Sequence, residues 1–559
     1  MSFPERFFIT LSFAFVAFLG FSPAHADDPE FSPDTIKAHL SFLADDLLEG
    51  REAGTRGYDL AAKYVETQFK ALGLKPAGDN GSYYQQVQLQ ESSLIKDSVT
   101  FSISSPDGTK TFQNAQDIIV RSDHLETDQA IEAEVVFAGF GVEAPELGHN
   151  DYEGLDVRGK IVAIFARTPS DFPSELGAHF GSADEKAIAA AKHGAIGILT
   201  LYTPTREQVF PFERALTFTY QPRMVWVGPD GVAFSAAPEI QIWATMGPDA
   251  APALFAGTGV DFAVLQQEAD TGSPKGFPLN VSVKIARQST HEIVSSPNVA
   301  AILPGSDPGL ADEYVIISAH LDHIGINEAV EGDVINNGAI DNATGIATML
   351  EVARVFAENP ARPRRSVLFL AVTAEEKGLL GAEYFANNPT VPADSIVGNV
   401  NLDASLLLFN FSDVIAFGAS HSDLGDTVAL AADKMGVLLS PDPMPEQGIF
   451  TRSDHYAFVK KGVPAVFLIL GFGEAPDGKV GSQEFGNYFS NHYHKPSDDL
   501  NLPIDYVAGA KFARLNWLIA NEIANADARP RWYEDDFFGN QFAPSLEKAV
   551  MQAPPAGGK

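Results

Sequence analysis

The sequence predicts an α/β fold, in which a mixed, mostly parallel sheet is sandwiched by helices and a smaller α+β domain is inserted. Three observations lead to this prediction. The chain has 559 residues, which is too long for one ordinary domain. After residue 295, short β-branched apolar runs alternate with helical patterns, as is typical of a parallel sheet covered on both faces. Residues 131–285 are instead β-rich and typical of a separate unit.

The N-terminal part is expected to begin with two helices. Ser32 precedes a proline and apolar residues at helical spacing, so we expect a helix that Ser32 caps. A glycine-rich loop follows, and then an amphipathic helix that ends near Gly73. We interpret Arg51 and Thr55 in that loop as structural rather than catalytic. Alternating residues between 84 and 120 predict strands.

The larger domain is expected to comprise residues 27–130 and 286–530, on either side of the insertion. Its apolar runs predict buried parallel strands at 314–318, 367–372, 397–402 and 463–470. The patterns between them predict helices at 345–358, 378–388, 424–435 and 504–523. Residues 531–559 are expected to be a C-terminal tail that frays, because its end is rich in proline and glycine.

The inserted domain, residues 131–285, is expected to be complete in itself. Its pattern predicts a helix at 183–193 and a buried strand at 195–201. Its histidines, such as His179 and His193, are scattered singly and do not form a cluster of metal-ligand residues. We therefore interpret them as structural.

The first 26 residues are typical of a signal peptide. A single Arg6 precedes the apolar run 7–21, and Ala-His-Ala at 24–26 is a cleavage site. The apolar run is shorter than the roughly 20 residues of a membrane span. We therefore predict cleavage after Ala26, a mature chain without a membrane span, and a periplasmic or extracellular location. A retained N-terminal anchor is the alternative.

Composition excludes several classes of function. Hydrophobic residues make up 45% of the chain and charged residues 20%, as in a globular protein with a sizeable core. The formal net charge of −35 argues against nucleic acid as a partner, because phosphate binding needs a basic surface. Cysteine is absent, which excludes a thiol nucleophile and a cysteine-ligated zinc site.

Acidic residues and histidines gather at the ends of the predicted strands and in the loops after them. Strand ends are where open α/β sheets place their chemistry. Carboxylates and imidazoles without cysteine suit a catalytic site for Zn²⁺ or another divalent cation. The residues concerned are His320, Asp322, Asp341, Glu375, Glu376, Asp403 and His494.

Each of these residues has a structural alternative when it is considered alone. His320 could be an ordinary core histidine, Asp341 a helix N-cap, and Asp322 a partner that orients His320 from the same side of a strand. The adjacent Glu375 and Glu376 are costly to bury unless a cation or a proton compensates one of them. Taken together, the residues predict two divalent ions, with one glutamate free to act as a general base.

The chain resembles the di-zinc exopeptidases of the aminopeptidase Y, glutamate carboxypeptidase and transferrin receptor family. The matching motifs, in chain order, are SAHLDH, GAIDNATG, AEEKGLLGAEYF, NLDA, RSDHYAFVKKGVPAVF and YHKPSDD. The opening LEGREAGTRG is similar to the family's N-terminal segment. The inserted stretch, with GFGVEAPELGHNDYEGLDVRGKIV, is similar to a protease-associated domain, which members often carry at this place.

The resemblance implies a centre of two Zn²⁺ ions, with Mn²⁺ or Co²⁺ as alternatives. By the family pattern, Asp341 bridges the two ions. One ion takes His320 and Asp403, and the other takes Glu376 and His494.

The resemblance also implies roles for residues beside the ions. Glu375 matches the general base, and Asp322 matches the carboxylate that orients His320. Tyr493 matches a phenol that steadies the tetrahedral intermediate in some members, with a loop aromatic as the alternative. Arg452 resembles a substrate-positioning residue, with a surface arginine as the alternative.

The implied function is hydrolysis of a peptide bond at a chain end by a metal-bound water that Glu375 activates. An aminopeptidase is favoured, because an acidic protein can supply negative charge near the free amine of a peptide substrate, whereas a carboxypeptidase needs an arginine-rich pocket. The alternatives are a carboxypeptidase, a glutaminyl cyclase-like zinc enzyme and a catalytically silent, receptor-like binding protein. The retention of all five ligand positions argues against the last two.

Overall fold

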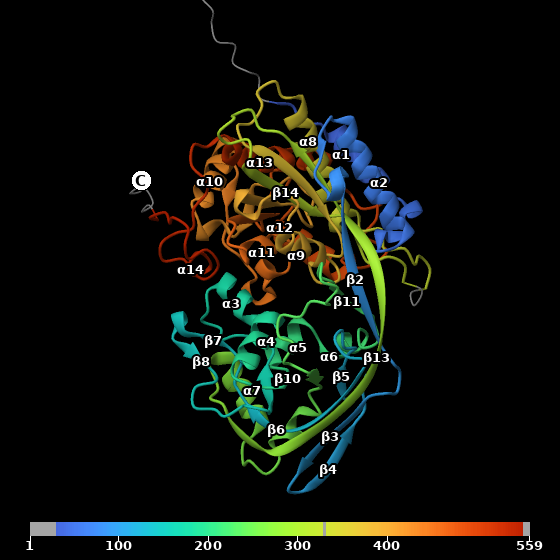
Figure 1. Ribbon diagram of the computed structural model, residues 1–559, viewed down its shortest axis with the longest axis vertical. Coiled ribbons are helices and arrows are strands. Elements are labelled where there is room, and N and C mark those ends of the chain that lie inside the picture. Colours follow the sequence, from blue (N-terminus) through green and yellow to red (C-terminus); the bar gives the residue numbers. More distant parts are fainter. Residues whose placement is uncertain (1–28, 328–330, 552–559) are drawn as a thin grey trace, which may run out of the picture. The chain divides into compact units, whose positions relative to one another are not determined.

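Two β-sheets share one long strand in the computed structural model, which describes residues 29–327 and 331–551. In strand β13 (Phe277–Leu303), residues 289–303 pair in the first sheet and residues 277–288 pair in the second. Figure 1 shows β13 running from one sheet into the other. The predicted signal peptide lies outside the described residues. Among the residues that are described, no helix is long and apolar enough to cross a membrane.

The first sheet has a parallel centre, as its apolar runs predicted. Strands β15, β14, β16 and β19 lie side by side in parallel, and β13 and β17 flank them in antiparallel orientation. The α/β fold class is therefore confirmed. In spatial order the strands are β18 (Leu438–Leu439), β17 (Asp413–Phe417), β19 (Ala465–Leu470), β16 (Ile396–Asn401), β14 (Tyr314–His320), β15 (Ser366–Val372), β13, β2 (Tyr84–Leu94) and β11 (Arg223–Trp226), with β1 (Lys75–Pro76) also paired to β13.

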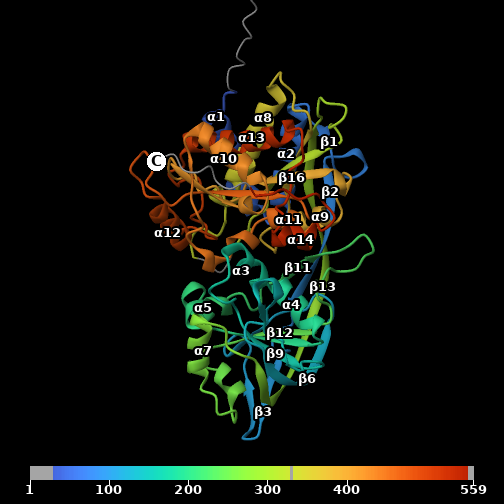
Figure 2. The same ribbon diagram turned by 90° about the vertical axis from the view of Figure 1, so that its left-hand side faces the viewer.

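Helices cover this sheet, and the strands of its centre are almost wholly buried. Helices α8 and α13 pack on β14, and α1 packs on both helices, whereas α11 contacts β16, β19 and α9 (Figure 2). The Ser32 side chain caps α1 as predicted, accepting a hydrogen bond from the Thr35 N–H. The helices are α1 (Pro33–Leu43), α2 (Arg56–Ala71), α8 (Thr344–Glu358), α9 (Leu380–Asn387), α10 (Leu424–Met435), α11 (His455–Val459), α12 (Gly481–Asn491) and α13 (Tyr506–Asn525).

The second sheet has its own hydrophobic core, which includes Phe137, Phe165 and Leu199. Its strand order is β4 (Gly108–Phe112), β3 (Thr100–Ser105), β13, β6 (Asp128–Phe137), β9 (Ile161–Phe165), β10 (Gly197–Leu201), β12 (Ile242–Met246) and β5 (Ile118–Val120). Around it lie α3 (Ser174–Gly181), α4 (Ala183–Lys192), α5 (Pro204–Val209), α6 (Phe212–Leu216), α7 (Phe262–Thr271) and the pair β7 (Glu143–Ala144) and β8 (His149–Asn150). The predicted helix and strand thus appear as α4 and β10.

The second sheet begins earlier in the chain than the predicted insertion. Strands β3, β4 and β5 form in the region where alternation predicted strands, but they pair in the second sheet, although the boundary at residue 131 assigned them to the larger domain. Alternation shows that a segment is a strand and does not reveal its pairing partner. We call residues 100–288 the second module and the remainder the first module; β11 of the second module pairs with β2.

The C-terminal segment packs on the first module from residue 531 to residue 549, so the expectation that it frays is wrong for these residues. Trp532 is buried, and its Nε1–H donates to the Gly462 carbonyl at 2.8 Å. Phe538 in helix α14 (Phe537–Phe542) is also buried. These aromatic anchors outweigh the proline and glycine content on which the expectation rested.

A buried histidine connects the two modules and the C-terminal segment. His421 Nε2 lies 2.5 Å from Glu175 in α3, and its Nδ1 lies 2.5 Å from Asp536, which caps α14. Burial lowers the pKa of His421, but hydrogen bonds and charges from Asp536 and Glu175 outweigh burial and raise it to about 9. His421 is therefore a cation held between two carboxylates at neutral pH.

We expect His421→Gln to destabilise the protein in a pH-dependent manner. The pKa of His421 is raised on folding, so its stabilisation is complete below pH ~6.5 and is lost as pH rises through about 9. The difference in unfolding free energy between parent and variant should be about 3 kcal/mol larger at pH 6.5 than at pH 9.5. Denaturant titrations at the two pH values measure it.

His39→Gln is the control for this comparison. Burial lowers the pKa of His39 to about 4, so this side chain stays neutral throughout the same pH interval. In the unfolded chain this histidine is half protonated at pH 6.5, so its effect on the unfolding free energy should change by only about 0.4 kcal/mol between the two pH values. An equal pH dependence in both variants would contradict the ionic role of His421.

Candidate metal centre

The sequence-predicted ligands meet at the carboxyl edge of the parallel strands. His320 ends β14, Asp403 lies two residues beyond β16, and Glu376 follows β15 in the next loop. Asp341 lies in the turn before α8, and His494 follows α12. Strand ends that share one edge bring these five side chains together although they are far apart in the sequence.

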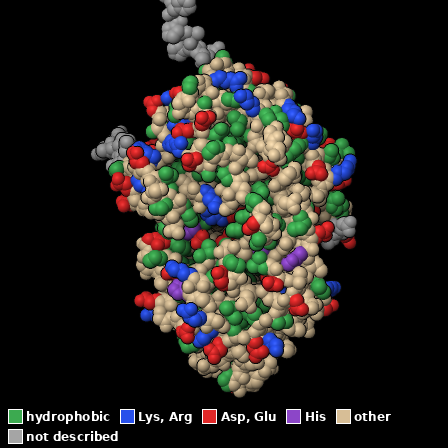
Figure 3. Space-filling model, viewed as in Figure 1, with side chains coloured by type: hydrophobic (Ala, Val, Ile, Leu, Met, Phe, Trp, Pro, Cys, Tyr) green, Lys and Arg blue, Asp and Glu red, His purple; other side chains and the backbone are tan. Residues whose placement is uncertain are grey.

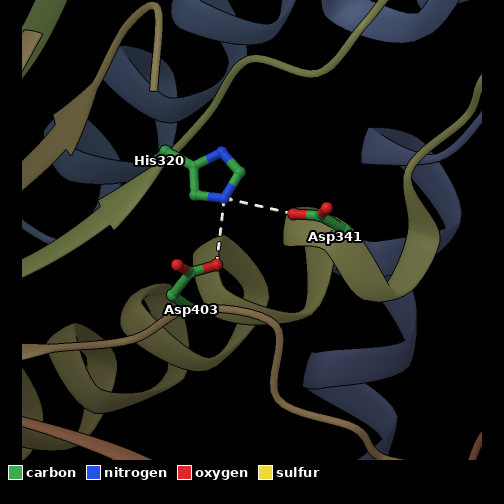
Figure 4. A group of neighbouring side chains, drawn as sticks. All are labelled: His320, Asp341 and Asp403. Carbon is green, nitrogen blue, oxygen red and sulfur yellow. Dashed lines mark hydrogen bonds and ion pairs between the residues drawn. The ribbon is translucent and has the colours of Figure 1, made fainter. Parts of the chain in front are cut away.

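Asp341 lies between two histidines. Its Oδ1 is 3.2 Å from His320 Nε2, and its Oδ2 is 3.3 Å from His494 Nε2. Figure 4 shows His320 pointing from the end of β14 toward Asp341 and Asp403. The residue that caps α8 is Ala343, so Asp341 does not serve as the N-cap. A carboxylate whose two oxygens face two different histidines has the geometry of a bridging ligand.

Each histidine has one further carboxylate of its own. Asp403 Oδ1 lies 3.0 Å from His320 Nε2, and Glu376 Oε2 lies 3.1 Å from His494 Nε2. The five predicted ligands therefore form two clusters that share Asp341. The geometry supports two ions, and the assignment of the ligands stays a prediction.

His323 is a further candidate ligand in the second cluster. The donor atoms of His323, Asp341 and Glu376 lie within 4.8 Å of one another. His323 Nδ1 is 2.6 Å from Glu376 Oε1, and its ring lies edge-on to that of His494. The SAHLDH motif contains His323, but sequence reasoning assigned no ligand role to it. Spacing alone did not distinguish it from His320.

The donor set fits zinc. Within the described residues, the buried polar atoms of the second cluster face one another at ion-pair distances, but His323 Nε2 is buried and has no hydrogen-bond partner. Buried polar atoms that lack partners are costly. Imidazole nitrogens and carboxylate oxygens are zinc ligands, so a bound ion would satisfy these atoms.

The electrostatics of the site also favour a cation. Burial lowers the pKa of His320, but the charges of Glu375 and Asp403 outweigh burial, and the pKa lies well above its usual value. Burial likewise lowers the pKa of His494, and Glu376 with Asp341 raises it to about 10. The carboxylates thus attract positive charge, and metal binding would displace these protons.

Glu375 and Asp322 lie beside the two clusters. Glu375 Oε2 is 4.0 Å from His320 Nε2. The Asp322 carboxylate accepts the backbone N–H groups of Glu375 and Glu376 at 3.0 and 3.2 Å. His320 Nδ1 is 3.1 Å from the Asp322 carbonyl oxygen and 3.9 Å from its carboxylate. The hydrogen bond that orients His320 therefore involves the Asp322 backbone, and the carboxylate orients the glutamate pair.

Tyr493 and Arg452 lie at the edge of the second cluster. The Tyr493 ring stacks on that of His494 with centroids 3.8 Å apart. Arg452 is exposed, and its Nη2–H donates to Tyr493 Oη at 3.5 Å. Both predicted residues are thus close to the ligands, and their roles stay predictions.

A buried arginine holds the turn that carries Asp341. Arg51 is 1% exposed, and its guanidinium donates to the carbonyls of Asn337 and Gly338 at 2.6 and 3.0 Å. It also donates to Leu321 beside His320. The interpretation of Arg51 as structural is compatible with these contacts. Sequence reasoning did not reveal that the contacts lie beside the candidate ligands His320 and Asp341.

Asp498 holds the same turn from the other side. Its carboxylate, which is fully buried, accepts the backbone N–H groups of Ile340 and Asp341 at 2.9 and 3.1 Å, and the Tyr488 hydroxyl at 2.9 Å. Sequence reasoning placed Asp498 in the YHKPSDD motif but gave it no role. The turn is tight, because Gly338 has φ +58° and a Cβ there would lie 2.2 Å from the Asp341 carbonyl oxygen.

Asp454 is a buried acid that sequence reasoning missed. It is fully buried, and neither carboxylate oxygen has a hydrogen-bond partner among the described residues. Burial raises its pKa well above the usual value, with His320 lowering it and Asp403 raising it further. The RSDH motif contains Asp454, so an acidic residue inside a family motif was the available signal.

We expect Arg51→Lys to weaken zinc binding about 10- to 100-fold, as loss of a ligand's supporting contacts typically does. Lysine keeps the charge but cannot reproduce the guanidinium fork that reaches the two turn carbonyls. Competition with a chromophoric chelator measures the zinc affinity.

Arg365→Lys is the matched control. Arg365 is equally buried and donates to the carbonyls of Ile523 and Ala526, away from the ligand turns. This variant should lower the denaturation midpoint and leave zinc affinity unchanged. Equal zinc affinities in the two variants would contradict the positioning role of Arg51.

Comparisons with known proteins identify relatives of this region. Residues 298–520 match the model of Peptidase family M28. A "Probable zinc metalloprotease" of Pyricularia oryzae is 27% identical over 272 residues, which are 43% of this chain and 52% of that protein. "Aminopeptidase NAALADL1" of Mus musculus is 27% identical over 265 residues, which are 40% of this chain and 33% of that protein. The chain thus spans about half the length, or less, of these two relatives.

A solved structure shares the fold. "Aminopeptidase from Aneurinibacillus sp. strain AM-1" superposes with a TM-score of 0.51 at 20% identity, covering 89% of this chain and 96% of that one. The family match spans every motif that carries a predicted ligand, from His320 to His494. It does not include the second module, so the protease-associated domain stays a prediction. The resemblance drawn from the motifs is confirmed over residues 298–520, the part of this chain that matches peptidase family M28.

Proposed function

We propose that the protein is an exported zinc aminopeptidase with two ions in its centre. The single observation that carries this proposal is the position of Asp341, whose two carboxylate oxygens face His320 and His494 at 3.2 and 3.3 Å. The relative named "Aminopeptidase NAALADL1" supports the aminopeptidase assignment. The signal-peptide pattern at residues 1–26 supports export.

The residues of the chain have distinct parts in this proposal. The ligands would hold zinc, which when bound would polarise the peptide carbonyl as a Lewis acid and acidify water. Glu375 belongs to neither ligand cluster, so its carboxylate is free to take a proton from the attacking water and return it to the leaving amine. Burial raises the pKa of Glu375 well above its usual value in the chain alone, and nearby cations favour its ionised form.

Tyr493 and Asp322 support this chemistry. The Tyr493 hydroxyl lies beside the second cluster and is a donor for a carbonyl oxygen that gains negative charge. Asp322 fixes the backbone of Glu375 and Glu376 through two N–H groups. It therefore holds the proposed base and a ligand in one geometry.

The alternatives are a carboxypeptidase, a glutaminyl cyclase-like enzyme and a silent binding protein. Both clusters are complete, which argues against a cyclase with one ion and against a silent site. We further propose that the second module is a protease-associated domain beside the centre.

The test is to measure the metal content of the purified mature protein together with hydrolysis of aminoacyl anilides, before and after chelation. About two equivalents of zinc, with activity lost on chelation and restored by zinc, are expected. Two ions without anilide cleavage would favour a carboxypeptidase or another amide substrate. Failure to take up zinc from solution would overturn the enzymatic proposal.

A further inference from the structure

A cavity of about 270 Å³ lies where the two modules meet. One wall comes from the segment after β9 and from α3 in the second module, and the other comes from residues 445–452 of the first module. Figure 3 shows the surface hollowed between the modules, with basic side chains beside the hollow. The lining includes Arg167, Thr168, Ser174, Arg206, Glu446 and Arg452.

The charge of this cavity is opposite to that of the whole protein. Its charged lining residues are three arginines and one acid, Glu446, although the chain has a formal net charge of −35. Among the residues that the structure describes, none of the three guanidinium groups has an ion-pair partner within 4.0 Å. A site that gathers cations in an acidic protein favours an anionic ligand.

Contacts hold the Arg167 backbone and the Arg206 side chain in the second module. The Arg167 carbonyl accepts a hydrogen bond from the Nζ of buried Lys186 at 2.7 Å. The Arg206 guanidinium lies 5.1 Å from the centre of the Phe210 ring and 5.8 Å from that of Tyr202. Ordering before binding reduces the entropic cost of recognition.

The third arginine connects the cavity to the metal centre. Arg452 lines the cavity and donates to Tyr493 Oη, and Tyr493 stacks on His494. His494 in turn contacts the bridging Asp341. Arg452 therefore lies between the cavity and the site in which a peptide would be cleaved.

We propose that this cavity is a substrate subsite that binds a carboxylate of the peptide, through Arg167 and Arg206. The carboxylate belongs either to an acidic side chain or to the C-terminus of a short peptide. Guanidinium groups recognise carboxylates through paired hydrogen bonds. This inference rests on the proposed peptidase function, and it makes acidic or short peptides the preferred substrates. Binding of the C-terminal carboxylate would favour the carboxypeptidase alternative, which needs an arginine-rich pocket.

The experiment uses zinc-loaded Glu375→Gln protein, so that peptides bind without turnover. Isothermal titration compares Ala-Glu-Ala-amide, Ala-Gln-Ala-amide and Ala-Gln-Ala with a free C-terminus. At least one carboxylate-bearing peptide should bind about 10-fold more tightly than the neutral amide. Tighter binding of Ala-Glu-Ala-amide would show that the side chain supplies the carboxylate, and tighter binding of Ala-Gln-Ala would show that the C-terminus supplies it.

Arg167→Ala and Arg206→Ala, each added to this protein, should remove the preference. Arg214→Ala is the matched control, because Arg214 lies 5.2 Å from the same Phe210 ring but is exposed and does not line the cavity. It should keep the preference. Equal binding of the three peptides, or an equal loss for all three in Arg167→Ala and Arg206→Ala, would overturn the subsite.

Hydrolysis of alanyl anilide by the parent protein separates the two proposals. Cleavage of the anilide without a carboxylate preference in binding would sink the subsite and keep the peptidase. A carboxylate preference without cleavage of any peptide would keep the subsite and sink the peptidase.

Discussion

Replacement of Asp341 by asparagine is expected to remove both zinc ions. The two carboxylate oxygens face different histidines, so this one side chain contributes to both clusters. An amide has no negative charge, and its nitrogen is a donor that cannot bind a cation, so one of the two oxygen contacts is lost outright. We expect metal content to fall from about two equivalents to near zero, with loss of activity. Elemental analysis after gel filtration measures it.

Two neighbouring substitutions make this prediction specific. Of the two histidines that face Asp341, Asp403 contacts only His320, and Glu376 contacts only His494. Asp403→Asn and Glu376→Gln should therefore each retain about one equivalent. Circular dichroism establishes that the variants are folded. The same metal content in Asp341→Asn and Asp403→Asn would contradict a shared ligand.

The sequence predicts the parallel centre and the ligand motifs because both depend on local patterns. Apolar runs identify buried strands, and β14, β15, β16 and β19 lie within two residues of their expected positions. His320 and Asp403 could be located because they follow such runs. Open α/β sheets place chemistry at the carboxyl ends of strands, so the clustering of these residues could be expected without any knowledge of the fold.

The remaining features depend on contacts that local patterns do not contain. Arg51 lies 290 positions before Asp341, and only the folded chain shows that its guanidinium reaches the ligand turn. Strands β3 to β5 were recognisable as strands, but their sheet was not. His323 and Asp454 lie inside the quoted motifs. The signals that mark them are a buried His323 Nε2 and a buried Asp454 carboxylate without hydrogen-bond partners in the described part of the chain, and these are properties of three-dimensional structure.

Replacement of Glu375 by glutamine is expected to lower kcat about 10²- to 10⁴-fold, the range for loss of a general base. Glutamine has nearly the same shape, and the backbone N–H of residue 375 still donates to Asp322. Glu375 belongs to neither ligand cluster, so the variant should keep its zinc. Rates with saturating anilide substrate, together with metal content, measure both effects.

The adjacent Glu376 supplies the sharpest comparison, since both residues follow the same strand and donate to the same Asp322 carboxylate. Glu376→Gln should lose an ion, whereas Glu375→Gln should lose turnover with both ions retained. A base that acts in proton transfer also moves the pH profile, so the acidic limb of kcat should disappear in Glu375→Gln. Loss of zinc from both variants would make Glu375 a ligand. An unchanged kcat in Glu375→Gln would require another general base, and the buried Asp454 is the next candidate.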